Sequence, residues 1–209
     1  MESKFRVEKD FLGEMNIDAD AYYGIQTLRA KNNFDITHTD ISLFPNFIKS
    51  LAKVKKACAI TNYELDDLTF EQKDAIVQAC DEIIDGKFHD QFIVDPIQGG
   101  AGTSTNMNAN EVIANRALEI LGHPRASYKI IHPNNHINLS QSTNDIYPTA
   151  IKITLHELIY KLKESLRHLR DVYNIKAVEF KDIIKMGRTQ LQDAVPMTLG
   201  QEFKTYSIM

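Results

Sequence analysis

The sequence predicts a mainly α-helical protein, in which an N-terminal helical domain is followed by the start of a long-helix bundle. After residue 45, apolar residues recur at steps of three and four, which is the spacing of one helix face. The longest such segment follows Pro148 and meets no further Gly or Pro before Gly187. A helix of roughly 30 residues spans about 45 Å, which favours a bundle over a compact α/β domain. We therefore predict two domains, residues 1–144 and 145–209.

The composition indicates a globular protein and argues against two classes of partner, nucleic acids and acidic membrane surfaces. Of the 209 residues, 43% are apolar, which is enough to bury a substantial core. The net charge of −4 is spread without blocks, so we expect neither nucleic acid nor an acidic membrane surface as a partner. The charged N-terminus and the absence of an uncharged apolar run of membrane-spanning length predict a cytoplasmic protein.

The first part of the chain is predicted to be an irregular arm, residues 1–45, that packs on something larger, and strand signals are nearly absent. Three helices are predicted to follow it. The first starts at Pro45, with the lysines at 49, 53, 55 and 56 mostly on its polar side. The second starts at a capping box formed by Thr69 and Gln72 and stops at Gly86. The third follows the glycine-rich stretch and ends at Gly122.

Two cysteines and seven histidines are candidates for chemistry, but their surroundings favour structural roles. Cys58 and Cys80 lie among apolar residues of helical patterns, so we expect buried free thiols in a reducing compartment and no metal site. The histidines show no pairing with Asp or Cys that would predict a general base; they stand at 38, 89, 123, 132, 136, 156 and 168.

The long helix and the last helix are predicted to associate with other helices. The long helix presents an apolar stripe with too few partners within the chain, formed by Leu158, Ile159, Leu162, Leu166 and Leu169. In the last helix, Leu199, Phe203 and Tyr206 share a face, and no cap follows before Met209. We expect this helix to be interrupted.

Three polar turns precede helices, and together they predict a binding site. The residues with neutral hydrogen-bond donors are Thr103 in the first turn, Ser142, Thr143 and Asn144 in the second, and Thr189 and Gln190 in the third. Such donors suit carboxylate oxygens and negative charge that grows in a transition state. Taken singly, each turn is better explained as a helix cap or an Asx turn than as a site. Three in one chain favour a site.

The motifs around these turns resemble those of the aspartase/fumarase superfamily. They read GGAGTSTNMNANE at residues 99–111, QSTNDIYPT at 141–149 and KMGRTQLQDAVPMTLGQEF at 185–203, and the resemblance extends over the whole chain. Within the superfamily they are most similar to the ammonia-lyases that act on aspartate. The resemblance implies reversible removal of ammonia from L-aspartate to give fumarate, through an aci-carboxylate intermediate.

The resemblance also implies roles for the six turn residues. The β-carboxylate of the substrate would be held by Thr103, Ser142 and Thr143. Asn144 and Gln190 would lie near the amino group, and Thr189 would contact the α-carboxylate. The partner is then a small dicarboxylate, the full-length form is a homotetramer, and no cofactor is required, with a divalent cation as a candidate activator.

One signature of the superfamily is absent from the sequence. The third signature, GSSxMPxKxN, supplies the catalytic base serine, and no Ser-Ser pair occurs in the 209 residues. Because the full chains of the family are more than twice this long, the sequence looks like an N-terminal portion. We therefore expect no catalytic residue within this chain, and an inactive segment when it stands alone.

Two other functions stay open as alternatives. A class II fumarase is disfavoured by Gln190, where fumarases have a histidine paired with an acid, and by the QSTND form of the second motif. A non-catalytic helical assembly partner would explain the apolar stripe of the long helix. The loop at residues 132–138 is a weaker candidate for an effector site, because it reads equally well as a connection between helices.

Overall fold

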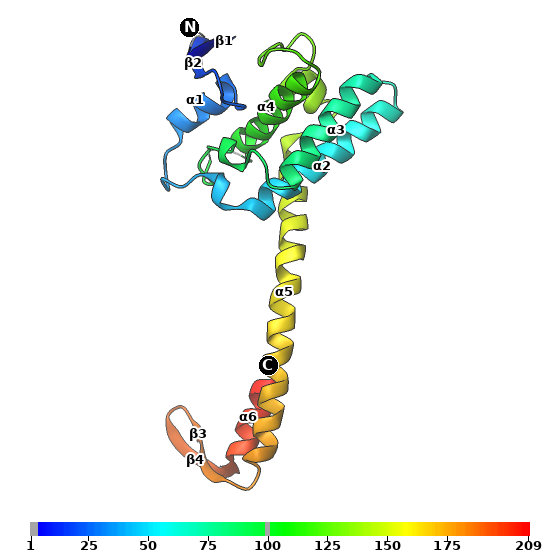
Figure 1. Cartoon of the computed structure of the whole chain (residues 1–209). Helices are drawn as coiled ribbons and strands as arrows, with labels where there is room; N and C mark the ends of the chain where they lie inside the picture. Colours follow the sequence, from blue (N-terminus) through cyan, green and yellow to red (C-terminus); the bar gives the residue numbers. More distant parts are fainter. Residues whose placement is uncertain (1–3, 99–100) are drawn as a thin grey trace. The chain divides into compact units, whose positions relative to one another are not determined.

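The computed structural model describes residues 4–98 and 101–209, and its secondary structure is mainly helical, as predicted. The elements are, in order, β1 (Phe5–Asp10), β2 (Gly13–Asp18), α1 (Ile25–Asn33), α2 (Pro45–Glu64), α3 (Phe70–Ile84), α4 (Thr103–Ile120), α5 (Thr143–Glu179), β3 (Ile184–Thr189), β4 (Gln192–Thr198) and α6 (Leu199–Ile208) (Figure 1). Short 3₁₀ turns lie at Ile41–Leu43 and His89–Gln91, and a π-helical turn lies at Pro133–Ile137.

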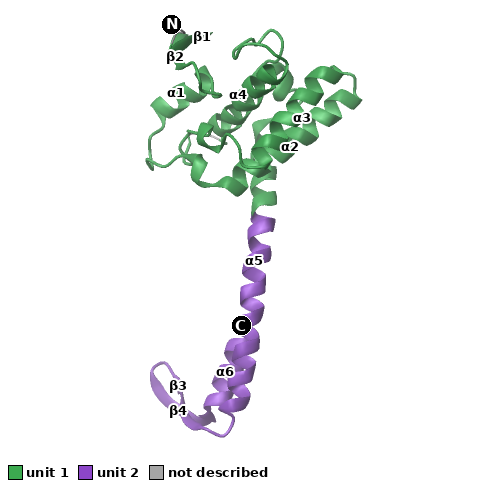
Figure 2. Cartoon of the chain, viewed as in Figure 1, with its two compact units in different colours: residues 1–154 green, residues 155–209 purple. Residues whose placement is uncertain are grey.

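The chain forms two compact units, residues 1–154 and 155–209 (Figure 2). Helix α5 contributes its first turns to the first unit and the rest of its length to the second. The domain boundary predicted after residue 144 stays a prediction.

The core of the first unit lies between α2, α3 and α4, and α3 packs against both of the others. The completely buried side chains include Ile48 of α2, Ile76 and Ile83 of α3, and Ile113 and Leu118 of α4. In α3, the completely buried Ile76, Ala79, Cys80 and Ile83 recur at steps of three and four, which is the helical periodicity, and burial of such faces holds the three helices together.

The ends of these helices agree with the sequence signals. Pro45 is the first residue of α2, where its missing N–H costs no hydrogen bond. Thr69 and Gln72 form the predicted capping box at the start of α3, with the Gln72 N–H donating to the Thr69 hydroxyl at 3.2 Å. After α3, Gly86 adopts a left-handed backbone with φ of 101°.

The arm, predicted to be irregular, is instead a hairpin and a helix. β1 and β2 pair antiparallel in a register that joins Phe5 to Asp18 and Asp10 to Gly13, and α1 follows. The hairpin escaped prediction because β1 turns a polar side inward: Glu8 is buried whereas Val7 is 63% exposed, so apolar residues do not mark the buried face of this strand.

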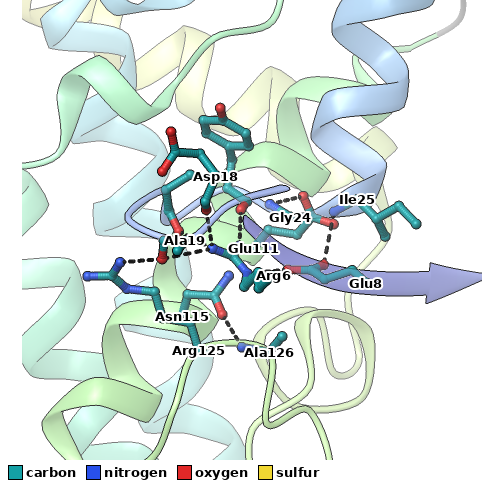
Figure 3. A network of polar contacts seen from close by, with 12 residues as sticks. Arg6, Glu8, Asp18, Ala19, Gly24, Ile25, Glu111, Asn115, Arg125 and Ala126 are labelled. Carbon is teal, nitrogen blue, oxygen red and sulfur yellow. Dashed lines mark hydrogen bonds and ion pairs between the residues drawn. The ribbon is translucent and has the colours of Figure 1, made fainter. Parts of the chain in front are cut away.

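Two buried carboxylates accept hydrogen bonds from the start of α1, and one of them, Glu111, thereby binds the arm to α4. Glu111 of α4 accepts from the backbone N–H groups of Gly24 at 2.8 Å and of Gln26 and Thr27 at 3.0 Å, and also from the Thr27 hydroxyl at 2.6 Å. Glu8 of β1 accepts from the N–H of Ile25 at 3.0 Å (Figure 3). Four N–H groups that a helix start leaves free are thereby satisfied by negative charge.

The same cluster contains a position that only glycine can fill. A Cβ atom on Gly24 would lie 2.8 Å from the carboxyl group of Glu111, from Glu8 and from the Tyr128 hydroxyl. On the other side of Glu8, Arg6 donates to that carboxylate at 2.9 Å and to the carbonyl oxygens of residues 18, 21 and 23 (Figure 3). The arm is therefore fixed by charged and backbone groups that have little freedom to move.

In the second unit, β3 and β4 form a hairpin that precedes α6. The stretch from Gln192 to Thr198, predicted to lead directly into a helix, is strand β4, and α6 starts at Leu199. A capping box of Thr198 and Gln201 marks that start. Most residues of β3 and β4 are exposed on both faces of the hairpin. The sequence therefore lacks the alternation of apolar and polar residues that would have indicated these strands.

Helix α6 packs on the end of α5 through aromatic side chains. Phe203 lies 5.2 Å from Phe180 and 6.0 Å from Tyr173 between ring centroids, so two of the three residues predicted to share a face, Phe203 and Tyr206, both contact Tyr173. A Cβ atom on Gly200 would overlap the carbonyl oxygen of Ala177, which explains a glycine at this crossing.

The apolar stripe predicted on the long helix is exposed in the second unit. Between 43% and 57% of the surface of each of its side chains is accessible: Leu158, Ile159, Leu162, Leu166 and Leu169. Across the ranges that the structure covers, no helix has the length and apolar character needed to cross a membrane.

We predict that Glu111→Gln destabilises the protein by about 1–3 kcal/mol, because an amide group would turn an N–H toward donors that need an acceptor. Urea unfolding measures this free energy. Glu64→Gln, an exposed carboxylate at the end of α2, is the matched control and should change the stability by less than about 0.5 kcal/mol. Equal effects of the two substitutions would contradict the role assigned to Glu111.

Candidate functional site

The first polar turn starts α4, and its hydroxyls are not used to cap the helix. The N-cap residue is Gly102, which has φ of 83° and no side chain to cap with, and Thr103 is the exposed first residue of α4. The reading of this turn as a Thr or Ser cap is therefore wrong. The two glycines at 99 and 100, which the motif includes, lie outside the described residues.

The loop that enters this turn is held by Asp95. Its carboxylate accepts hydrogen bonds from the backbone N–H of Ile36 at 3.0 Å, of Thr37 at 2.6 Å and of Ile97 at 2.8 Å. These bonds lower the pKa of Asp95 against the opposing effect of its burial. The buried carboxylate thereby fixes where the chain approaches α4.

The second polar turn starts α5, and its three predicted residues have different surroundings. Ser142 caps the helix, since its hydroxyl accepts from the N–H of Asn144 at 3.2 Å. Thr143 is half-buried, and its hydroxyl accepts from the side-chain amide of Asn106 at 3.1 Å. Asn144 is exposed.

The structure brings the first and second turns together within the first unit. Asn106 on α4 bonds to Thr143 on α5, and a Cβ atom on Gly102 would overlap the ring of Tyr147. A pocket of about 380 Å³ lies beside this contact, lined by Pro96, Ile97, Gln98, Ala101, Gly102, Asn144, Tyr147 and Pro148. The contact between Asn106 and Thr143 joins the starts of α4 and α5 into one polar wall, and of the six predicted site residues Asn144 is the one that lines the pocket beside it.

A buried lysine that the sequence reading placed among surface lysines supports this wall. Lys55 of α2 is 1% exposed, and its ammonium group donates to Oδ1 of Asn138 and to Oε1 of Gln141, both at 2.9 Å. Asn106 and Asn110 of α4 donate to the same Asn138 oxygen at 3.0 and 3.3 Å. The loop before α5 is therefore tied to α2 and α4 by one shared acceptor.

A signal in the sequence could have identified Lys55. It stands four residues after Leu51 and four before Ala59, both of which are buried, so it belongs to the apolar face of α2. A lysine on such a face must either reach solvent along its stem or find acceptors inside. Here it finds two side-chain amides.

The third polar turn belongs to the second unit and is the tip of the β3–β4 hairpin. Thr189 pairs with Gln192, and both Gln190 and Leu191 between them have positive φ, of 50° and 64°. This is the geometry of a two-residue hairpin turn whose positions favour Gly or Asn. Thr189 and Gln190 are exposed, so their side chains are accessible to a ligand.

The histidines and cysteines have structural surroundings. In the π-helical turn, Nδ1 of His132 accepts from the N–H groups of Asn134 and Asn135, and Nδ1 of His136 accepts from the N–H of His132 at 2.7 Å. Burial lowers the pKa of both rings. Cys80 is buried as predicted, whereas Cys58 is only half-buried. Within residues 4–98 and 101–209, no group of three His, Cys, Asp or Glu side chains could hold a metal ion.

We predict that the stability contributed by Lys55 depends on pH. Burial lowers the pKa of Lys55 to about 7 from 10.5, so between these values the unfolded chain binds more protons than the folded one, and stability rises with pH. Relative to Lys55→Met, the wild type should gain about 1–2 kcal/mol between pH 7 and pH 9. Urea unfolding at several pH values measures the difference, with Lys49→Met on the same helix as the control. A constant difference would contradict the prediction.

Comparison with known proteins identifies the family. The family model described as "Lyase" matches residues 13–209. The aspartate ammonia-lyase of Helicobacter pylori strain J99 is 59% identical over 204 residues, which are 98% of this chain and 44% of that protein. The chain therefore spans less than half the length of this relative.

Solved structures agree with the sequence match. The structure titled fumarate lyase:delta crystallin from Brucella melitensis bound to cobalt superposes with a TM-score of 0.91 at 54% identity, over 98% of this chain and 44% of that one. The class II fumarase from Schistosoma mansoni superposes with a TM-score of 0.88 at 43% identity, over 98% and 43% of the two chains. The resemblance that the three motifs indicated is confirmed, and this chain belongs to the lyase family.

Proposed function

We propose that this protein acts as an aspartate ammonia-lyase, which removes ammonia reversibly from L-aspartate to give fumarate. The observation that carries the proposal is the pair of glutamines at 141 and 190 within motifs of a lyase-family chain. Gln190 has no titratable group, so it cannot activate a water in the way a hydratase requires. The identity of 59% to an aspartate ammonia-lyase, against 43% to a fumarase, supports the same choice.

The six turn residues are proposed to hold the substrate through neutral donors. Both carboxylates and the amino group would be bound by Thr103, Ser142, Thr143, Asn144, Thr189 and Gln190, with the roles implied by the family motifs. The first four support this proposal by their position at two adjacent helix starts, which the bond from Asn106 to Thr143 joins, and Asn144 also lines the pocket. Helix starts add unpaired N–H groups and partial positive charge, which favour an anion.

The proposed chemistry explains why donors rather than cations are needed at the β-carboxylate. Removal of the proton next to this group gives the aci-carboxylate, which places a second negative charge on the same two oxygens. Donors already aimed at those oxygens stabilise the transition state more than the ground state, because the charge is larger there. Neutral hydroxyls achieve this without holding the product through a permanent ion pair.

The base that removes the proton is proposed to lie outside these 209 residues. The signature that supplies a base serine in the family does not occur in the sequence. We therefore propose that this chain binds and orients the substrate, and that it converts no aspartate when it stands alone. No cofactor is proposed, and no step is assigned to a divalent cation.

The protein is further proposed to assemble as a homotetramer through the second unit. The stripe of five leucine and isoleucine side chains on α5 is about half exposed, which is costly for a surface in water. Burial of this stripe against other copies of the helix would form the central bundle. A non-catalytic assembly role uses the same stripe, but it leaves the polar wall at α4 and α5 unexplained.

We predict that the full gene product forms fumarate from L-aspartate and none from L-malate, followed by the ultraviolet absorbance of fumarate. The reason is the absence of a titratable group at residue 190. This 209-residue chain, purified alone, should form no fumarate from either substrate. Turnover of malate by the full product would favour the fumarase, and turnover by this chain alone would refute the assignment of the base.

We predict that Thr103→Val lowers kcat of the full gene product for aspartate by about 100- to 1000-fold, because one donor to the growing charge is lost. The hydroxyl caps no helix, so the fold should be unaffected. Thr149→Val, an exposed threonine two turns into α5, is the matched control. If both variants keep wild-type kcat, Thr103 does not contact the reacting carboxylate.

A further inference from the structure

Asn106 connects the two helix starts through its side-chain amide. It lies in the first turn of α4, three residues after Thr103, and is 1% exposed. Its Nδ2 donates to the hydroxyl oxygen of Thr143 at 3.1 Å and to Oδ1 of Asn138 at 3.0 Å. Both hydrogens of the amide are therefore committed, one to each acceptor.

The bond from Asn106 decides what the Thr143 hydroxyl can do. A hydroxyl group carries one hydrogen to donate and two lone pairs that accept. An amide N–H can only donate, so Thr143 must accept from Asn106 and cannot donate to it. The hydroxyl hydrogen is thereby left for another acceptor, such as a carboxylate oxygen of a ligand.

The direction of the Asn106 amide is itself set by neighbouring groups. Nζ of Lys55 donates to Oδ1 of Asn138, which an ammonium and a neutral amine can both do, so Asn138 presents its oxygen to the lysine. Nδ2 of Asn138 donates to the backbone carbonyl of Gln141 at 3.1 Å, which supports the same orientation. Because Asn138 presents an oxygen, Asn106 must present its NH₂ group to Asn138. Asn138 Oδ1 thus accepts from both Lys55 and Asn106, and Asn106 donates to both Asn138 and Thr143.

The orientation of Asn106 is kept at a cost to stability. Its Oδ1 is a buried oxygen for which the structure gives no hydrogen-bond partner. A buried polar atom without a partner typically costs about 1–3 kcal/mol. The unpartnered oxygen has an explanation if the NH₂ group of Asn106, and not its oxygen, must face Thr143.

We propose that Asn106 is a positioning residue, which makes the Thr143 hydroxyl a hydrogen-bond donor to the β-carboxylate of the substrate. The inference rests on the proposed function, because it needs Thr143 to face that carboxylate. Asn106 contacts Thr143 and not the substrate. Its effect therefore passes through the Thr143 hydroxyl.

A double-mutant cycle in the full gene product tests the proposal. Asn106→Ala should lower kcat for aspartate by about 10- to 100-fold, with a smaller change in KM, because the donation strengthens as charge develops. In a Thr143→Val background, where no hydroxyl is left to orient, the same substitution should change kcat by less than about threefold. In a Thr143→Ser background, which keeps the hydroxyl, the full loss should return.

Three results would overturn the proposal. An equal loss of kcat in all three backgrounds shows a general structural role, and no loss in the wild-type background shows no role. Wild-type protein that fails to convert aspartate defeats the proposed function and this inference together, before any variant is compared. Circular dichroism reports folding, and if Asn106→Ala does not fold, Asn138→Ala removes the group that orients Asn106 and should show the same dependence on Thr143.

Discussion

The hydrogen bonds from the buried ammonium of Lys55 to Asn138 and Gln141 are the interaction on which the geometry of the polar wall depends. They join α2 to the loop that precedes α5, and Asn106 and Asn110 join α4 to the same Asn138 oxygen. A buried cation is expensive unless its hydrogens find acceptors. Because Lys55 donates to Asn138 and Gln141, both side-chain amides present their oxygens to it.

A second anchor of the same kind holds the arm. Glu8 and Glu111 can only accept hydrogen bonds when they are ionised, and they face the four free N–H groups at the start of α1. Lys55 and Glu111 therefore act in opposite senses, one as a buried donor and the other as a buried acceptor. Helix α4 carries Glu111 and reaches Lys55 through Asn138, so it is held on the side of the arm and on the side of α5.

The sequence predicted the helices well because their signals are local. The periodicity of α2, α3 and α4, the capping box at Thr69 and the long uninterrupted pattern of α5 each depend on residues close together in the chain. The two hairpins were missed, because the buried side of β1 is polar at Glu8 and β4 is mostly exposed, so in neither strand do apolar residues mark a buried face. Their pairing depends on turn geometry, including positive φ at Gln190 and Leu191.

The candidate site was predictable in its residue types but not in its connections. The three polar turns could be found from their composition, and the contact between the first two follows only from the packing of α4 against the start of α5. Lys55 was grouped with surface lysines because a lysine is seldom buried, and Asn106 and Asn138 gave no separate signal. The residues that orient a site are often ordinary amides, whose role depends on neighbours distant in sequence.

Under the proposed function, the site holds a dicarboxylate without a cation at the reacting carboxylate. Hydroxyls at helix starts supply donors, and the buried amides behind them settle which way those donors point. Such a site is preorganised, since its groups need little reorientation when charge develops. This preorganisation costs folding free energy at two buried groups, the unpartnered amide oxygen of Asn106 and the amino group of Lys55.

The most direct measurement of the central claim is a crystal structure of the full gene product with L-aspartate bound. The account predicts that the hydroxyl oxygens of Thr103, Ser142 and Thr143 lie within about 3.2 Å of the β-carboxylate oxygens. It also predicts that Asn106 remains bonded to Thr143 from behind. A β-carboxylate paired with an arginine or lysine, with these three hydroxyls out of reach, would contradict it.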